Sequence, residues 1–152
     1  MRLQLAGSYE IADRLKSAIA QYDLWISQHG DDYRLAQARN GRCWARALLG
    51  EDLDKALADC NAALKLSPHA PNILDSRGLV FLRLGELDKA IADYDETLKI
   101  NPKVYWSLYG RGLAKLRKGM KAEGQADIAA ATAIAPLLPE NATRHGIVAP
   151  AP

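Results

Sequence analysis

Apolar and polar residues follow a helical spacing over almost the whole chain, in short segments separated by glycine and proline. The clearest pair of segments covers residues 72–84 and 88–100; they meet at Gly85 and end at Asn101-Pro102. Apolar residues that recur every three or four positions predict amphipathic helices, and a glycine just after such a segment is a common helix stop. The stretch 72–102 therefore predicts two helices joined by a tight turn.

The same pattern returns along the chain every 34 residues. Three prolines keep this interval at the ends of successive units, namely Pro68, Pro102 and Pro136. Gly78 and Gly112 keep it as well, and one extra residue lies in the turn at 50–53. The period predicts full units over residues 33–68, 71–102 and 105–136, and a weaker copy of the pattern predicts a degenerate unit over residues 1–30.

The last residues do not follow the period. A short closing helix is predicted over 137–146, which would cover the exposed face of the last unit, and the Pro- and Ala-rich residues 147–152 are expected to be a flexible tail. Residues 1–146 then form one domain. Because Met1 falls inside the first helix of the degenerate unit, we expect either a frayed N-terminal cap or a chain trimmed from a longer precursor.

A helix-turn-helix unit of 34 residues resembles the tetratricopeptide repeat (TPR) family. The residues that carry the resemblance are small residues at fixed places and the closing prolines; the small ones are Gly78, Gly112, Ala56, Ala90, Gly124, Ala63 and Ala131. The resemblance implies an all-α, right-handed α-solenoid of the bacterial TPR type. It also implies a non-catalytic scaffold whose stacked first helices line a concave groove that takes a peptide or a partner helix.

Composition and charge agree with this class and exclude others. Alanine and leucine dominate, so helix propensity is high. With 20 Lys and Arg against 18 Asp and Glu, no overall field favours nucleic acid or an anionic membrane as partner. No apolar run approaches the roughly 20 residues that cross a bilayer. His29, His69 and His145 are scattered, so we expect no metal, no cofactor and no catalytic residues.

Register along the first helices predicts which residues face the groove. Exposed aromatic residues beside arginine are enriched at binding hot spots. The hypothesis is that partner side chains are buried against this face while arginines pair with acidic groups at its rim; alternatively, Trp106 or Tyr109 only packs against a neighbouring unit. The predicted groove residues are Trp44, Asp75, Leu79, Leu82, Arg83, Trp106, Tyr109, Leu113 and Arg117.

A different role remains open for the whole chain. The alternative is a structural or self-association module, which would form a homo-oligomer. A further alternative is a fragment that packs against the rest of a larger protein. The feature that favours this alternative is the start of the chain inside a unit.

Charged residues also recur with the period. Arginines occupy one place in the first helices, and aspartates occupy one place in the second helices: Arg42, Arg77 and Arg111, with Asp59, Asp93 and Asp127. In the degenerate unit these places hold Leu5 and Gln21, so both charges are absent together. This joint absence favours structural ion pairs over a row of ligand-binding arginines.

The two cysteines lie at similar distances from the turn near residue 51. Cys43 and Cys60 would therefore lie at one level on facing helices, where a disulfide could form. The alternative is a pair of buried thiols in a reducing compartment. An oxidised pair would favour a periplasmic or other exported location over the cytoplasm.

Overall fold

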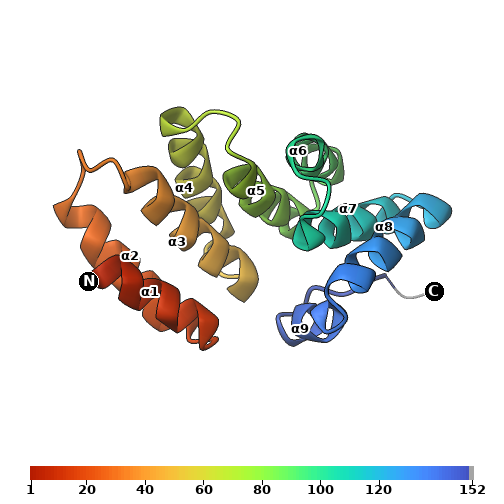
Figure 1. Ribbon diagram of the computed structural model, residues 1–152, viewed down its shortest axis with the longest axis horizontal. Coiled ribbons are helices and arrows are strands. Elements are labelled where there is room, and N and C mark those ends of the chain that lie inside the picture. Colours follow the sequence, from red (N-terminus) through yellow and green to blue (C-terminus); the bar gives the residue numbers. More distant parts are fainter. Residues whose placement is uncertain (151–152) are drawn as a thin grey trace.

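The computed structural model describes residues 1–150, which form helices joined by short turns (Figure 1). Over these residues the helices are α1 (Arg2–Ile11), α2 (Leu15–Gln28), α3 (Leu35–Leu49), α4 (Leu53–Leu66), α5 (Pro71–Leu84), α6 (Leu87–Ile100), α7 (Tyr105–Arg117), α8 (Lys121–Ile134) and α9 (Leu138–Arg144). The first eight pair as antiparallel hairpins, and each hairpin packs on the next. The all-α helical repeat solenoid expected from the period is confirmed.

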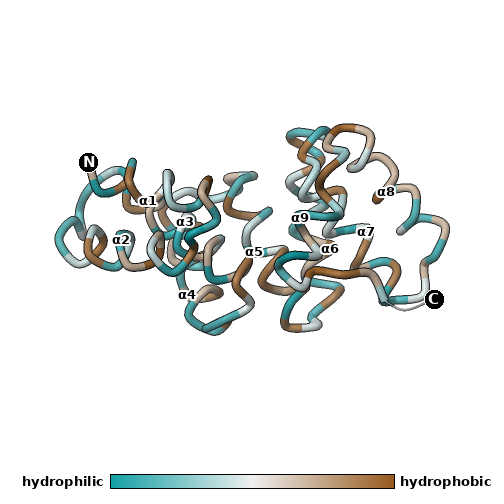
Figure 2. The backbone as a smooth tube through the Cα atoms, turned by 90° about the horizontal axis from the view of Figure 1, so that it is seen from below, coloured by the Kyte–Doolittle hydropathy of each residue, from teal (hydrophilic) through white to brown (hydrophobic). Residues whose placement is uncertain are grey.

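The hairpins follow one another along an arc. The first helices of successive hairpins contact one another, α1 with α3, α3 with α5 and α5 with α7. They therefore line the inner side of the arc, and α9 lies on this side too (Figure 1). Figure 2 shows hydrophobic and hydrophilic stretches alternating along the helices, as expected for elements that bury one face against a neighbour.

Glycine ends the first helices where the chain turns into the second ones. Gly50 and Gly85 have φ of 70° and 76°, a left-handed conformation that residues with a Cβ rarely adopt. Each donates its backbone N–H to a carbonyl in the last turn of its helix, which closes the hairpin. The extra residue predicted at 50–53 lies in the first of these turns, where Asp52 is also left-handed, with φ of 51°.

A tyrosine of the second helix fills the space between two hairpins. Tyr94 is 1% exposed, and a Cβ added to Gly110 of the next hairpin would lie 2.3 Å from its hydroxyl. Likewise, a Cβ added to Gly41 would lie 2.3 Å from the hydroxyl of Tyr22. Close packing of these rings against backbone explains why glycine recurs at this place in the first helices.

A disulfide replaces the equivalent contact in the second hairpin. Cys43 and Cys60 are bonded across α3 and α4, with their Cα atoms 5.7 Å apart. By register, Cys43 corresponds to Gly78 and Cys60 corresponds to Tyr94. The cysteine pair therefore joins the two helices covalently at the level where the other hairpins rely on glycine.

The recurring arginines form two-pronged contacts with the recurring aspartates of the facing helices. Each arginine donates through Nε and Nη2 to both carboxylate oxygens of one aspartate, at 2.5 to 2.8 Å. The pairs are Arg42 with Asp59, Arg77 with Asp93 and Arg111 with Asp127. Paired, hydrogen-bonded charges of this kind are tolerated in an interior where a single charge would not be.

The third nitrogen of each arginine reaches the preceding hairpin. Arg42 donates through Nη1 to Asp23 at 2.6 Å. Arg77 donates through Nη1 to Asn61 at 2.9 Å, and Arg111 donates through Nη1 to Asp95 at 2.8 Å. These three acceptors occupy equivalent places in their second helices. Each arginine therefore joins its own hairpin and also fixes it to its neighbour.

Replacing Asp93 with Ala should destabilise the fold, because it leaves the half-buried guanidinium of Arg77 with only a neutral partner. We expect the free energy of unfolding to fall by about 3 kcal/mol in urea denaturation followed by circular dichroism. The matched control is Glu96→Ala on the same helix, where an exposed carboxylate pairs with Lys99. That change should cost less than about 0.5 kcal/mol. Equal small effects of the two substitutions would contradict the structural role of the pair.

Reducing the disulfide should also lower stability, because the unfolded chain regains the freedom that the cross-link removes. For a loop of 17 residues the entropic model gives a loss of about 3 kcal/mol in urea denaturation. A double Cys43→Ala and Cys60→Ala variant should show the same loss and no further change with reductant. Alkylation of both thiols in protein that was never reduced would show that the bond is absent.

Candidate functional site

The concave groove is lined by α3, α5 and α7, and its two ends differ. We call the end near the first turns of these helices the open half, and the end near their last turns the filled half. The predicted residues Asp75, Trp106 and Tyr109 belong to the first turns of α5 and α7, whereas Arg83 and Arg117 belong to the last turns.

Arginine side chains in the filled half bind backbone carbonyls of the chain itself. Arg83 donates to the carbonyls of Ala47 and Leu48 at 3.1 and 2.7 Å, and also to the carbonyl of His145. Burial, together with the nearby charge of Arg117, lowers the pKa of Arg83. The guanidinium therefore caps the end of α3 and holds the segment that follows α9.

Arg117 makes the corresponding contacts one hairpin later. Its Nη1 donates to the carbonyl of Leu82 at 3.0 Å, and its Nη2 donates to the carbonyl of Val148 at 3.3 Å. The hypothesis that Arg83 and Arg117 are free to pair with a partner's acidic groups therefore does not fit this structure. Both are engaged within the chain.

The segment after α9 occupies the filled half. Ile147 is 2% exposed and belongs to the same apolar cluster as Leu79, Leu82 and Leu113. Residues 147 and 148 were expected to begin a flexible tail, but burial of the first and the hydrogen bond to the second hold them in place; residues 151 and 152 lie outside the described part of the chain.

The apolar anchors predicted for the groove are covered. Leu79 and Leu113 are 2% and 0% exposed, and Leu82 and Tyr109 are also buried. Their register toward the inner face is consistent with the prediction, but the chain's own Ile147 and α9 take part in the cluster that buries them. A partner therefore cannot reach these side chains in this conformation.

The same segment brings the two ends of the arc together. His145 Nε2 lies 3.3 Å from Oδ1 of Asp13, which is in the turn between α1 and α2. Contacts from the segment that follows α9 thus reach the first hairpin as well as Arg83 of α5 and Arg117 of α7.

The open half contains a hollow of about 350 Å³, within the size range of sites that hold small ligands or single side chains. Trp44 forms part of its wall and meets Trp106 edge to face, with ring centroids 5.3 Å apart. Trp106 in turn meets Tyr109 at 6.4 Å. The hollow is lined by Asn40, Trp44, Pro71, Asn72, Asp75, Ser76, Asn101 and Val104.

Asp75 is the charged residue of this hollow, and its charge is not neutralised. The Ser107 hydroxyl donates to its carboxylate, and no lysine, arginine or histidine within the described residues comes within 4.0 Å of it. Burial raises its pKa to about 6, and the hydrogen bond from Ser107 offsets part of this rise. The other aspartates buried between helices, such as Asp93, each have an arginine partner.

Asn40 adds a second unused acceptor that the sequence did not single out. Its Oδ1 is buried and has no hydrogen-bond donor in the described part of the chain. By register, Asn40 on α3 corresponds to Asp75 on α5, so consecutive helices place the two acceptors next to each other. That register equivalence was the signal in the sequence that could have identified it.

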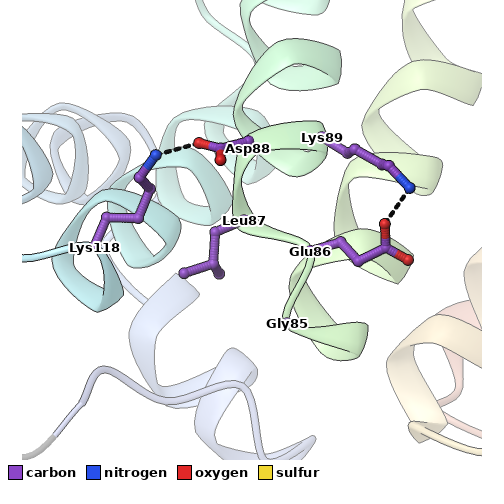
Figure 3. Close-up of a pocket in the computed structure, with 6 residues that line it drawn as sticks. All are labelled: Gly85, Glu86, Leu87, Asp88, Lys89 and Lys118. Atoms are coloured by element: carbon purple, nitrogen blue, oxygen red, sulfur yellow. Dashed lines mark hydrogen bonds and ion pairs between the residues drawn. The ribbon is translucent and has the colours of Figure 1, made fainter.

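A second hollow lies at the turn between α5 and α6, away from the groove. Figure 3 shows that its charged side chains pair with one another, Lys118 with Asp88 and Lys89 with Glu86. Because these charges are already neutralised, the open half of the groove is the better candidate site.

The described residues contain neither a metal-binding cluster nor a membrane-spanning helix. No group of three or more His, Cys, Asp or Glu side chains in residues 1–150 could hold a metal ion. Within the same residues, no helix has the length and apolar character to cross a membrane.

Stacked helical hairpins with an inner groove define the class of α-solenoid repeat scaffolds. A family model described as the TPR repeat matches residues 78–119, which span α5 to α7. The matched segment, the period of 34 residues and the fold together support a protein of the tetratricopeptide repeat family. Proteins of this family generally serve as non-catalytic scaffolds for protein–protein interaction. No curated protein matches the sequence.

Solved structures share the fold at low sequence identity. A thermophilic TPR protein in Thermus thermophilus is 16% identical in sequence, with a TM-score of 0.77. The alignment covers 96% of this chain and 82% of the Thermus chain. MamA is 22% identical with a TM-score of 0.68, covering 97% and 80%. A TPR protein from Parabacteroides merdae is 20% identical with a TM-score of 0.66, covering 96% and 57%.

Replacing Asp75 with Asn should stabilise the protein at neutral pH, because it removes a carboxylate that must ionise without a cation. Burial raises the pKa of Asp75 in the folded state to about 6, from its usual value of 3.8 in the unfolded state. The contribution of this carboxyl to stability is therefore fully present below pH 3.8 and is lost as the pH rises through about 6. Urea denaturation should show Asp75→Asn to be more stable than the unmodified protein by about 2 kcal/mol at pH 7.5.

At about pH 3 the advantage of Asp75→Asn should nearly disappear, because the carboxyl of the unmodified protein is then mostly protonated in both the folded and the unfolded state. The control is Asp88→Asn, whose side chain is exposed and paired with Lys118. If Asp75→Asn were less stable at both pH values, the carboxylate would have a structural partner.

Proposed function

We propose that the protein binds an extended segment of a partner protein in the open half of its groove. The observation that carries this proposal is the partly exposed Trp44 and Trp106 pair beside an open hollow, which contains a buried acceptor without a donor, Asn40 Oδ1, and the unpaired charge of Asp75. Tryptophan is enriched at binding hot spots because it contributes a large apolar area together with a polar N–H group. Buried acceptors without donors favour a ligand that supplies those donors.

The proposal is narrower than a groove used along its whole length. The filled half is occupied by residues 145–148, so the partner segment would lie across the middle of α3 and the first halves of α5 and α7. A segment of a few residues suits this length better than a whole helix. The disulfide supports an oxidising compartment as the place of action, because such bonds persist there.

Self-association has weaker support. Leu5 and Ile11 of α1 are exposed, but exposed polar residues such as Gln4 and Ser8 occupy the same helix. Single apolar residues among polar ones are normal on a protein surface. The open half of the groove combines aromatic rings with unused acceptors and is therefore the better supported interface.

Photo-crosslinking in cells of the source organism tests this function. A photoreactive phenylalanine analogue at Asn72, which is exposed and lines the hollow, should form adducts with a partner polypeptide that mass spectrometry can identify. The matched control position is Lys65, which is exposed on α4, a second helix on the other side of the hairpins. It should give few adducts.

Adding Trp44→Leu to the Asn72 variant should reduce the adducts by about tenfold, the typical effect of losing a hot-spot aromatic. The folded state of this variant is checked by circular dichroism. Adducts that form from Lys65 and not from Asn72 would place the interface on the outer face and refute the proposal.

A further inference from the structure

We infer that the open half of the groove recognises a lysine or arginine side chain of the partner segment, with the Asp75 carboxylate as its counter-charge. This inference rests on the function proposed above and specifies the chemistry of the ligand. It follows from three properties of the hollow: its charge, its hydrogen-bonding groups and its aromatic wall.

The charge of the hollow is negative and uncompensated. Among the described residues that line it, Asp75 is the only charged one. The basic side chains of the neighbouring half do not supply a counter-ion, because Arg83 and Arg117 are directed to backbone carbonyls. Asp75 is half-buried and has no cationic partner among the described residues, so a cation beside it interacts in a lower dielectric than it would beside a fully exposed carboxylate.

The hydrogen-bonding groups of the hollow require a donor. The buried Oδ1 of Asn40 has no donor, and the carboxylate of Asp75 has only Ser107. Lysine and arginine side chains carry donors and no acceptors, so either one satisfies both groups at once. A glutamate or aspartate of the partner would instead face an acidic group of like charge and an acceptor.

The aromatic wall suits the same ligand. Cations are attracted to the faces of indole rings, and the apolar stems of lysine and arginine pack well against them. Trp44 lines the hollow, and Trp106 stands against it at 5.3 Å. A lysine or arginine in the hollow can therefore place its stem along the Trp44 ring while its charged end reaches Asp75.

The groups that face Asp75 leave it as the group that titrates near neutral pH. They are Ser107 from α7, Tyr94 from α6, and Asn40 and Trp44 from α3. Burial holds the pKa of Tyr94 well above its usual value, so this tyrosine stays neutral. Binding of a cation should therefore weaken as the pH falls through about 6, where Asp75 gains its proton.

Peptide titration tests the inference on the full chain. The probes are acetylated and amidated pentapeptides of alanine with lysine, arginine, norleucine or glutamate at the centre. Binding is followed by the indole N–H signals of Trp44 and Trp106 in nuclear magnetic resonance spectra, and the buried Trp25 is the internal reference. We expect saturable shifts with lysine and arginine at pH 7.5, and affinity at least about tenfold weaker with norleucine, which lacks the charge-assisted hydrogen bonds.

The Asp75→Asn variant separates the outcomes. It should bind the lysine and norleucine peptides with affinities that differ by less than about twofold, whereas the Asp88→Asn control should keep the preference for lysine. Equal binding of lysine and norleucine to the unmodified protein would refute the cationic ligand and leave the groove function standing. Absence of any shift with all four peptides would refute binding at this hollow altogether, and preference for glutamate would reverse the assignment.

Discussion

The close contact between a second-helix side chain and the backbone of the first helices sets the geometry on which the rest depends. Tyr94 fills the space beside Gly78 and Gly110, where an added Cβ would lie 2.7 and 2.3 Å from its ring and hydroxyl. This contact fixes how near two helices and two hairpins approach. At that spacing the fork of Arg77 meets both Asp93 and Asn61, and the first helices come close enough to form one continuous inner face.

Features that repeat with the period could be predicted from the sequence. Helices, turns and the partners of Arg77 and Arg111 depend on residues close in sequence or related by a constant interval, so register alone relates them. The joint absence of charge at Leu5 and Gln21 was informative for the same reason. The pairing of Cys43 with Cys60 could be foreseen only as a possibility, because equal distance from a turn permits a bond and does not require one.

Features that depend on the non-repeating end of the chain could not be predicted. Register placed Leu79 and Leu113 on the inner face, but their exposure is decided by α9 and Ile147, which follow no period. Arg83 and Arg117 look like free binding groups until the carbonyls of residues 145 and 148 are in place. Asp75 likewise could not be recognised from the sequence, because its distinguishing property is the lack of a basic partner. The sequence contains many basic residues. Only the fold shows that, among the described residues, none reaches this carboxylate.

The contact between His145 and Asp13 changes how the array should behave as a whole. In an open solenoid each hairpin touches only its neighbours, so stability is a sum over adjacent units and the number of units can vary. Here His145, the residue after the last helix, also contacts Asp13 in the first turn and accepts a hydrogen bond from Arg83 of α5. A hairpin inserted into the middle would pull these contacts apart. A longer array would therefore have to lose the contact between residues 145 and 13, which an open solenoid does not contain.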